Sequence, residues 1–163
     1  MKNIFYILFL LPNLFLSQSI KWNWIGNISF DEKTDRKDFV LCNENQIYQY
    51  FNDSNGFQYK GEKLAIEEEF EKKYISENVK KENGLVRIRF VVNCNGESDR
   101  FRILTANYDY EPIEFDKNIT SQLLNITKSL IGWIPKSVNG KKVDYYQYLI
   151  FKIKDGKIDE ILP

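Results

Sequence analysis

The chain has 163 residues, in which 23 lysines and arginines balance 23 aspartates and glutamates, and it has no histidine. This balance supplies no broad positive field, so nucleic acid and anionic membrane surfaces are not expected partners. Without histidine, the usual base for a serine or cysteine nucleophile and a common zinc ligand are both absent. Aromatic residues make up 15% of the chain, which suits sheets and protein interfaces.

The N-terminus predicts a secretory signal peptide. Lys2 precedes an apolar run over residues 4–16, which is shorter than the roughly 20 residues that span a bilayer. Ser17 and Ser19 occupy the −3 and −1 positions of a cleavage site. We therefore expect residues 1–19 to be removed, leaving no membrane span. The alternative is an uncleaved segment that anchors the protein in the inner membrane.

Two cysteines, Cys42 and Cys94, would then enter an oxidising compartment. A disulfide between them would close a loop of about 50 residues and stabilise the fold by roughly 4 kcal/mol. The alternative is two buried free thiols that never meet. Their spacing fits no zinc pattern, so neither a metal nor a cofactor is predicted.

Residues 20–58 lack a clear period and are interpreted as a lead-in that packs on the main domain. Apolar patches at 39–41 and 47–51 predict short strands within it. The charged run from Asp31 to Asp38 predicts a solvated loop.

The pattern becomes helical over residues 61–79. Ile66, Phe70 and Tyr74 recur every four residues, so they share one helix face. Glutamates gather toward the start of this segment and lysines follow, an order that the helix dipole favours. Neighbouring glutamates point in different directions around a helix, so they are interpreted as a solvated face and not as a catalytic pair.

Residues 84–104 predict a β-hairpin closed by a turn at Asn95-Gly96. Apolar side chains alternate along its first strand, which predicts an antiparallel sheet covered on one side. The mixed face carries four arginines, which form either a small anion-binding patch or separate solvated side chains: Arg87, Arg89, Arg100 and Arg102.

A second helix is predicted over residues 115–133, where apolar residues step by three or four and form a stripe. Pro135 forbids its continuation. A turn at Asn139-Gly140 leads into a long strand over 143–153, and a short tail strand follows over 157–162. The expected fold is therefore α+β, with two layers: an antiparallel sheet of three strands, or slightly more, packed against two helices.

The order strand, strand, helix, Trp-x-Pro, Asn-Gly, strand resembles the C-terminal domain of TonB, as found in periplasmic TonB-like proteins. The resemblance covers residues 59–153 and assigns 59–163 to that domain. It implies a periplasmic location. Unlike full-length TonB, the chain has no proline-rich spacer, so energy transfer is not implied. The residues that carry the resemblance are the stretch from Gly84 to Gly96 together with Trp133, Pro135, Asn139 and Gly140.

The resemblance implies a module without catalytic machinery that pairs an extended partner segment with an edge of its sheet. We expect the strand over 143–153 to offer that edge, with side-chain contacts from Tyr146, Tyr148, Ile150 and Lys152. These side chains could instead cover the second face of the sheet or pair with the tail strand. Implied partners are a TonB-dependent outer-membrane transporter, another envelope protein or a second copy in a homodimer. The alternative is a structural or self-associating envelope protein with no transport role.

Enzymatic activity is not expected. The chain has no G-x-S-x-G motif and no glycine loop that would cradle a phosphate. Glu111 and Asp116 are the carboxylate pair considered for glycoside cleavage, and nothing in the surrounding sequence marks them as buried.

Overall fold

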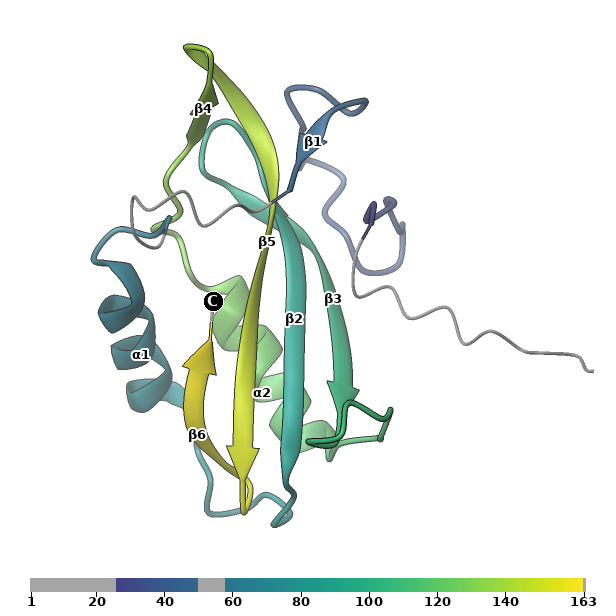
Figure 1. The fold of residues 1–163 in the computed structure, drawn as a ribbon, viewed down its shortest axis with the longest axis vertical. Helices are drawn as coiled ribbons and strands as arrows, with labels where there is room; N and C mark the ends of the chain where they lie inside the picture. Colours follow the sequence, from purple (N-terminus) through teal and green to yellow (C-terminus); the bar gives the residue numbers. More distant parts are fainter. Residues whose placement is uncertain (1–25, 50–57, 163) are drawn as a thin grey trace, which may run out of the picture.

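The computed structural model describes residues 26–49 and 58–162, in which one mixed sheet of six strands packs against two helices (Figure 1). The expected α+β class is confirmed, although the sheet is larger than predicted. No helix in these ranges has the length and apolar character that a membrane crossing needs. The predicted signal peptide lies outside the described residues. The elements are β1 (Ile47–Tyr48), α1 (Glu62–Lys73), β2 (Gly84–Val92), β3 (Ser98–Ala106), α2 (Lys117–Lys128), β4 (Lys136–Val138), β5 (Lys141–Lys154) and β6 (Lys157–Leu162).

Tight turns build the antiparallel part of the sheet. The predicted hairpin is confirmed, because β2 pairs with β3 across the turn that contains Asn95 and Gly96. Asn139 and Gly140 both adopt positive φ, 51° and 75°, and join β4 to β5. Asp155 and Gly156 do the same, at 50° and 74°, between β5 and β6. Two successive residues at positive φ match the twist of paired strands, so each dipeptide sets a hairpin.

The long strand β5 occupies the middle of the sheet. β2 pairs along one side of it, while β1 and β6 pair along the other. The pairing of β1 is parallel, which makes the sheet mixed. The side chains from Tyr145 to Ile153 that were expected on one face, at every second position, are all buried in the core.

Helix α1 ends at Lys73, earlier than the predicted end near residue 79. Tyr74 already has extended backbone angles, and the next residue is held away from helical geometry by α2. The side-chain amide of Gln122 accepts from the Ile75 N–H at 2.8 Å and donates to the Ile75 carbonyl at 3.1 Å. Both backbone groups of Ile75 therefore have partners without a further helical turn.

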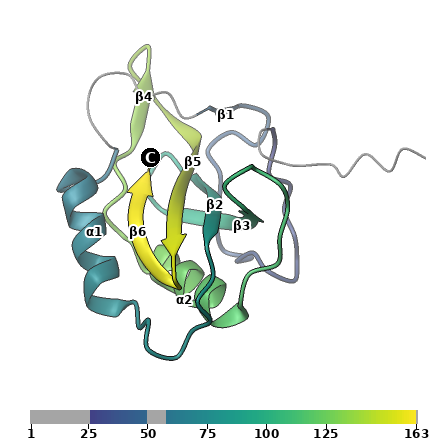
Figure 2. The ribbon, with the colours of Figure 1, turned by 60° about the horizontal axis from the view of Figure 1, so that its bottom comes forward.

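Helix α2 is shorter than the predicted segment at both ends. It begins where the Asp116 carboxylate accepts from the Asn118 N–H at 2.9 Å, which is an N-cap. It ends at Lys128, yet Leu130 and Trp133 remain buried beyond that point. The apolar stripe in the sequence therefore marks buried positions, and these continue past the end of the helix. Figures 1 and 2 show α2 lying behind the sheet and α1 standing beside β6.

The Trp-x-Pro segment is part of the core. The ring of Trp133 contacts Phe90 and Tyr59, with centroid separations of 4.9 Å in both cases. The backbone of Tyr59 forms a bridge with Trp133, and a Cβ on Gly132 would lie 2.7 Å from the Tyr59 ring. These contacts attach the chain before α1 to the chain after α2.

Residues 26–49 cover part of the second face of the sheet. Ile28, Phe39 and Leu41 form a small core with Val91 and Tyr146. The patch at 39–41 was expected to be a strand, and this expectation is wrong: the segment has no regular structure. Its alternation instead places two side chains inward with Val40 pointing to solvent.

Candidate protein-binding site

The four side chains predicted to bind a partner share one face of β5, opposite the helices, because alternate residues of a strand point the same way. They are not equally accessible. Tyr146 is only 3% exposed, and its hydroxyl lies 3.3 Å from the Asn27 side-chain oxygen. Tyr148, Ile150 and Lys152 are half-buried. The guanidinium of Arg87 stacks on the Tyr148 ring at 4.3 Å.

The expectation of a continuous open edge along residues 143–153 is wrong. β1 pairs with β5 at Asp144 and Tyr145, and β6 pairs with it from Ile150 to Lys154. The physical reason is the turn at Asp155-Gly156, which folds the tail strand back onto β5. A turn of this kind between two predicted strands was the signal that could have placed β6 at the border.

The border of the sheet on this side is therefore β6. Among the described strands, β6 pairs with β5 alone, so its second side carries backbone groups available to another strand. The opposite border, β3, is partly occupied: Ala106 forms a bridge with Pro112, and the Asp99 carboxylate accepts from the Arg36 N–H at 2.8 Å.

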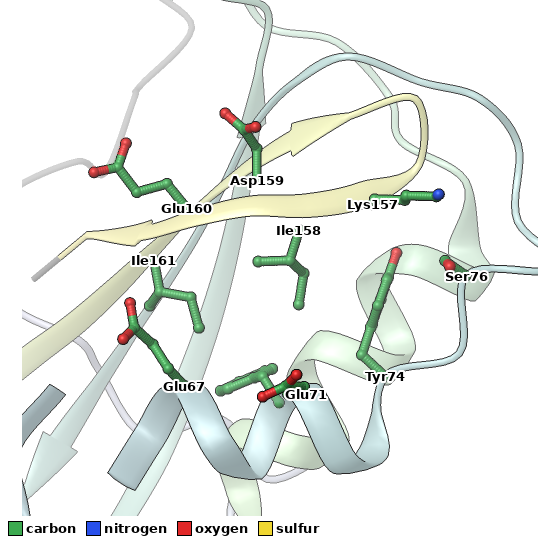
Figure 3. A pocket seen from close by; sticks show the side chains of 10 residues that line it. Glu67, Glu71, Tyr74, Ser76, Lys157, Ile158, Asp159, Glu160 and Ile161 are labelled. Atoms are coloured by element: carbon green, nitrogen blue, oxygen red, sulfur yellow. The ribbon is translucent and has the colours of Figure 1, made fainter. Parts of the chain in front are cut away.

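A groove of about 430 Å³ lies between β6 and α1 (Figure 3). Ile158 and Ile161 point from β6 toward the helix, and Phe70 of α1 also lines the groove and belongs to the core. The remaining lining is polar or charged and includes Glu67, Glu71, Tyr74, Ser76, Lys157, Asp159 and Glu160.

Tyr74 closes one end of this groove. Its hydroxyl donates to the Gly156 carbonyl at 2.7 Å, which ties the end of α1 to the β5–β6 turn. Burial, with a smaller contribution from the negative charge of Asp116, raises the pKa of Tyr74 to about 12. The phenol therefore stays protonated and keeps donating at neutral pH.

The arginines of the mixed face are not a free anion site. Arg102 makes two hydrogen bonds of 2.7 Å with the carboxylate of Asp35, and Arg100 forms an ion pair with Glu44. Burial of Asp35 opposes its ionisation, but hydrogen bonds from Arg102, the Asp31 N–H and Thr34 outweigh it and lower the pKa of Asp35. The arginines thus hold residues 26–49 on the sheet, which was not predicted.

Cys42 and Cys94 are joined by a disulfide, with Cα atoms 6.1 Å apart. The buried carboxylate of Asp144 accepts from the Asn43 N–H at 2.7 Å and from the Cys94 N–H at 2.9 Å, so it positions both sides of the bridge. Ligand atoms of Cys42, Cys94 and Asp144 lie within 4.8 Å of one another. Metal sites use thiolates, however, and a disulfide supplies none.

The carboxylates considered for catalysis have structural partners. Glu111 accepts from the Asn107 side chain at 3.0 Å within an exposed turn. Asp116 caps α2, and hydrogen bonds from the N–H groups of Asn118 and Lys80 lower its pKa. A general acid needs a raised pKa, so this environment acts in the opposite direction.

No protein-family model matches the chain, and neither a curated protein nor a solved structure matches it.

Proposed function

We propose that this protein is a non-enzymatic binding module of the periplasm that takes up an extended partner segment by β-strand addition. The segment pairs with the second side of β6 and lies in the groove beside α1. The observation that carries this proposal is the border position of β6, whose second side has no partner among the described strands. Such an edge can supply main-chain hydrogen bonds, and pockets for alternate side chains give specificity.

The resemblance to the TonB C-terminal domain supplies the partner class. A TonB-dependent outer-membrane transporter, or another envelope protein with an extended segment, fits this proposal. The side chains Tyr148 and Ile150 on the second face add contacts only if the partner reaches across β6.

Site-specific photocrosslinking in the native envelope tests the proposal. A photoreactive residue at Asp159, on the exposed part of β6, is compared with one at Ile131, which is 92% exposed and lies outside the groove lining. We expect one recurrent partner segment at position 159 and not at 131. A synthetic peptide of that segment should then slow amide exchange in residues 157–162.

Equal adducts from both positions, or a captured peptide that leaves β6 exchange unchanged, would contradict strand addition. Adducts formed only with a second copy of the chain would favour the structural, self-associating alternative.

A further inference from the structure

We propose that the groove between α1 and β6 selects extended segments that carry lysine or arginine side chains alternating with apolar ones. This inference rests on the proposed function and adds the chemistry of the partner. It follows from the charges of the groove lining, from the direction of its side chains and from the sequence of β6.

The charged lining of the groove is predominantly acidic. Four carboxylates and one ammonium group, that of Lys157, contribute to it. The chain neutralises two of the acids itself: Glu67 pairs with Lys63 at 3.3 Å, and Asp159 pairs with Lys152 at 3.2 Å. Glu71 and Glu160 make no ion pair with any described residue. Glu71 is therefore available to a cation of a partner. Glu160 stands opposite Lys152 in the β5–β6 pairing, but that ammonium already pairs with Asp159, so one lysine serves two carboxylates.

Glu71 and Glu160 lie on opposite sides of the plane of β6. Glu71 projects from α1, whereas Glu160 projects from β6 on the far side of the strand (Figure 3). A strand added to β6 alternates its side chains between these two faces. Basic side chains on either face of the added strand therefore meet a carboxylate.

The apolar part of the lining accommodates the stems of such side chains. Ile158 and Ile161 face α1, and Phe70 lines the same groove and packs in the same core cluster. Lysine and arginine lay their methylene stems on apolar surface while the charged head remains in water. In a peptide that alternates lysine with valine, one kind of side chain lies on this surface and the other on the far side of β6. Either the valines pack here while the lysines point to the side of Glu160, or the lysine stems lie here with their heads near Glu71.

The sequence of β6 disfavours a second copy of this chain as occupant. If two β6 strands paired antiparallel over residues 157–162, Asp159 of each would stand opposite Glu160 of the other. Like charges directly opposite one another destabilise a strand pair. Adjacent acids on a border strand thus oppose self-pairing and favour a basic partner.

Peptide binding measured by fluorescence anisotropy tests the inference. The probe is a short labelled peptide, blocked at both ends, that alternates lysine with valine, and its acidic twin has glutamate in place of lysine. We expect the lysine peptide to bind at least about tenfold more tightly, since each cross-strand ion pair contributes a few tenths to about 1 kcal/mol. The E71Q/E160Q variant should lose about two- to fivefold in affinity for it, because all lysines of an alternating peptide share one face and meet one of the two acids.

The matched control is E32Q/E114Q, which removes the same charge from exposed positions outside the groove lining. It should bind the lysine peptide like the parent protein. The inference is wrong if the acidic twin binds equally well, if E71Q/E160Q behaves like the control, or if the lysine peptide fails to bind at millimolar concentration.

N-methylated peptides separate this inference from the proposed function. Methylation of alternate amides removes the donors on one edge of the peptide, so one of the two methylation patterns should abolish binding. If both methylated peptides bind like the parent peptide, strand addition itself is contradicted. If methylation abolishes binding while lysine and glutamate peptides bind alike, only the charge preference fails.

Discussion

Removal of the disulfide is expected to destabilise the protein substantially. The bridge joins residues 52 apart in sequence, and the chain-entropy relation gives about 4 kcal/mol for a loop of that length. Cys42 is exposed and Cys94 half-buried, so a C42S/C94S variant buries little new polar surface. The loss in unfolding free energy should therefore arise mainly from the released loop.

Urea unfolding, followed by circular dichroism and tryptophan fluorescence, measures this loss. With a slope of about 2 kcal/mol per molar urea, the midpoint should fall by about 2 M. Wild-type protein reduced with a thiol is the control, because it has the same open loop without a substitution. Its midpoint should match that of C42S/C94S.

The folded structure has other attachments that should survive in the variant. The pairs Arg102–Asp35 and Arg100–Glu44 and the small core beneath residues 26–49 do not require the bridge. Amide exchange in 26–49 should accelerate while that in β2 and β5 follows global unfolding. A midpoint within about 0.3 M of the oxidised wild type would refute the loop-entropy reasoning.

Two further predictions concern pH. The native pKa of Asp35 is lowered, so its ionised form stabilises the fold above the unfolded pKa of about 4, and this stability is lost as pH falls through the native pKa. D35N should lower the unfolding free energy by about 2–3 kcal/mol at pH 7. In a plot of urea midpoint against pH, the variant should also show a smaller decrease at acid pH than the wild type. The native pKa of Tyr74 is raised to about 12, so stability should be full below about pH 10 and fall by about 2 kcal/mol as pH rises to 12. Y74F should remove that alkaline loss, and an unchanged alkaline limb in Y74F, or an unchanged acid limb in D35N, would contradict these assignments.

Local features of the fold were predictable because their signals are local. The Asn-Gly dipeptides at 95–96 and 139–140 predicted their turns, where Gly96, Asn139 and Gly140 adopt positive φ. Alternation predicted the core face of β2 and β5. The end of α2 was less predictable, since apolar periodicity reports burial. Leu130 and Trp133 continue the buried stripe after the helix has ended at Lys128.

Strand order was not predictable in the same way, because pairing depends on segments far apart in sequence. The parallel match of β1 with β5 joins residues about a hundred positions apart and leaves no periodic signal in a strand of two residues. The position of β6 determines which strand forms the border. Its pairing with β5 moved the candidate site from the side chains of Tyr146 and Tyr148 to the groove beside α1.

The acidic residues illustrate why a candidate site needs coordinates as well as composition. Asp35 belongs to the charged run that was expected to be a solvated loop, yet it is buried and pairs with Arg102. Glu44 pairs with Arg100, and both ion pairs attach the irregular segment 26–49 to the sheet. Glu71 and Glu160 look no different in the sequence, but Glu71 makes no ion pair with a described residue, and Glu160 shares the ammonium of Lys152 with Asp159. A balanced net charge therefore says little about local roles: Asp35 and Glu44 pair with arginines of the sheet, whereas our proposal assigns Glu71 and Glu160, beside β6, to partner recognition. Under that proposal, a cation of the partner pairs with Glu71 or adds to Lys152 beside Glu160.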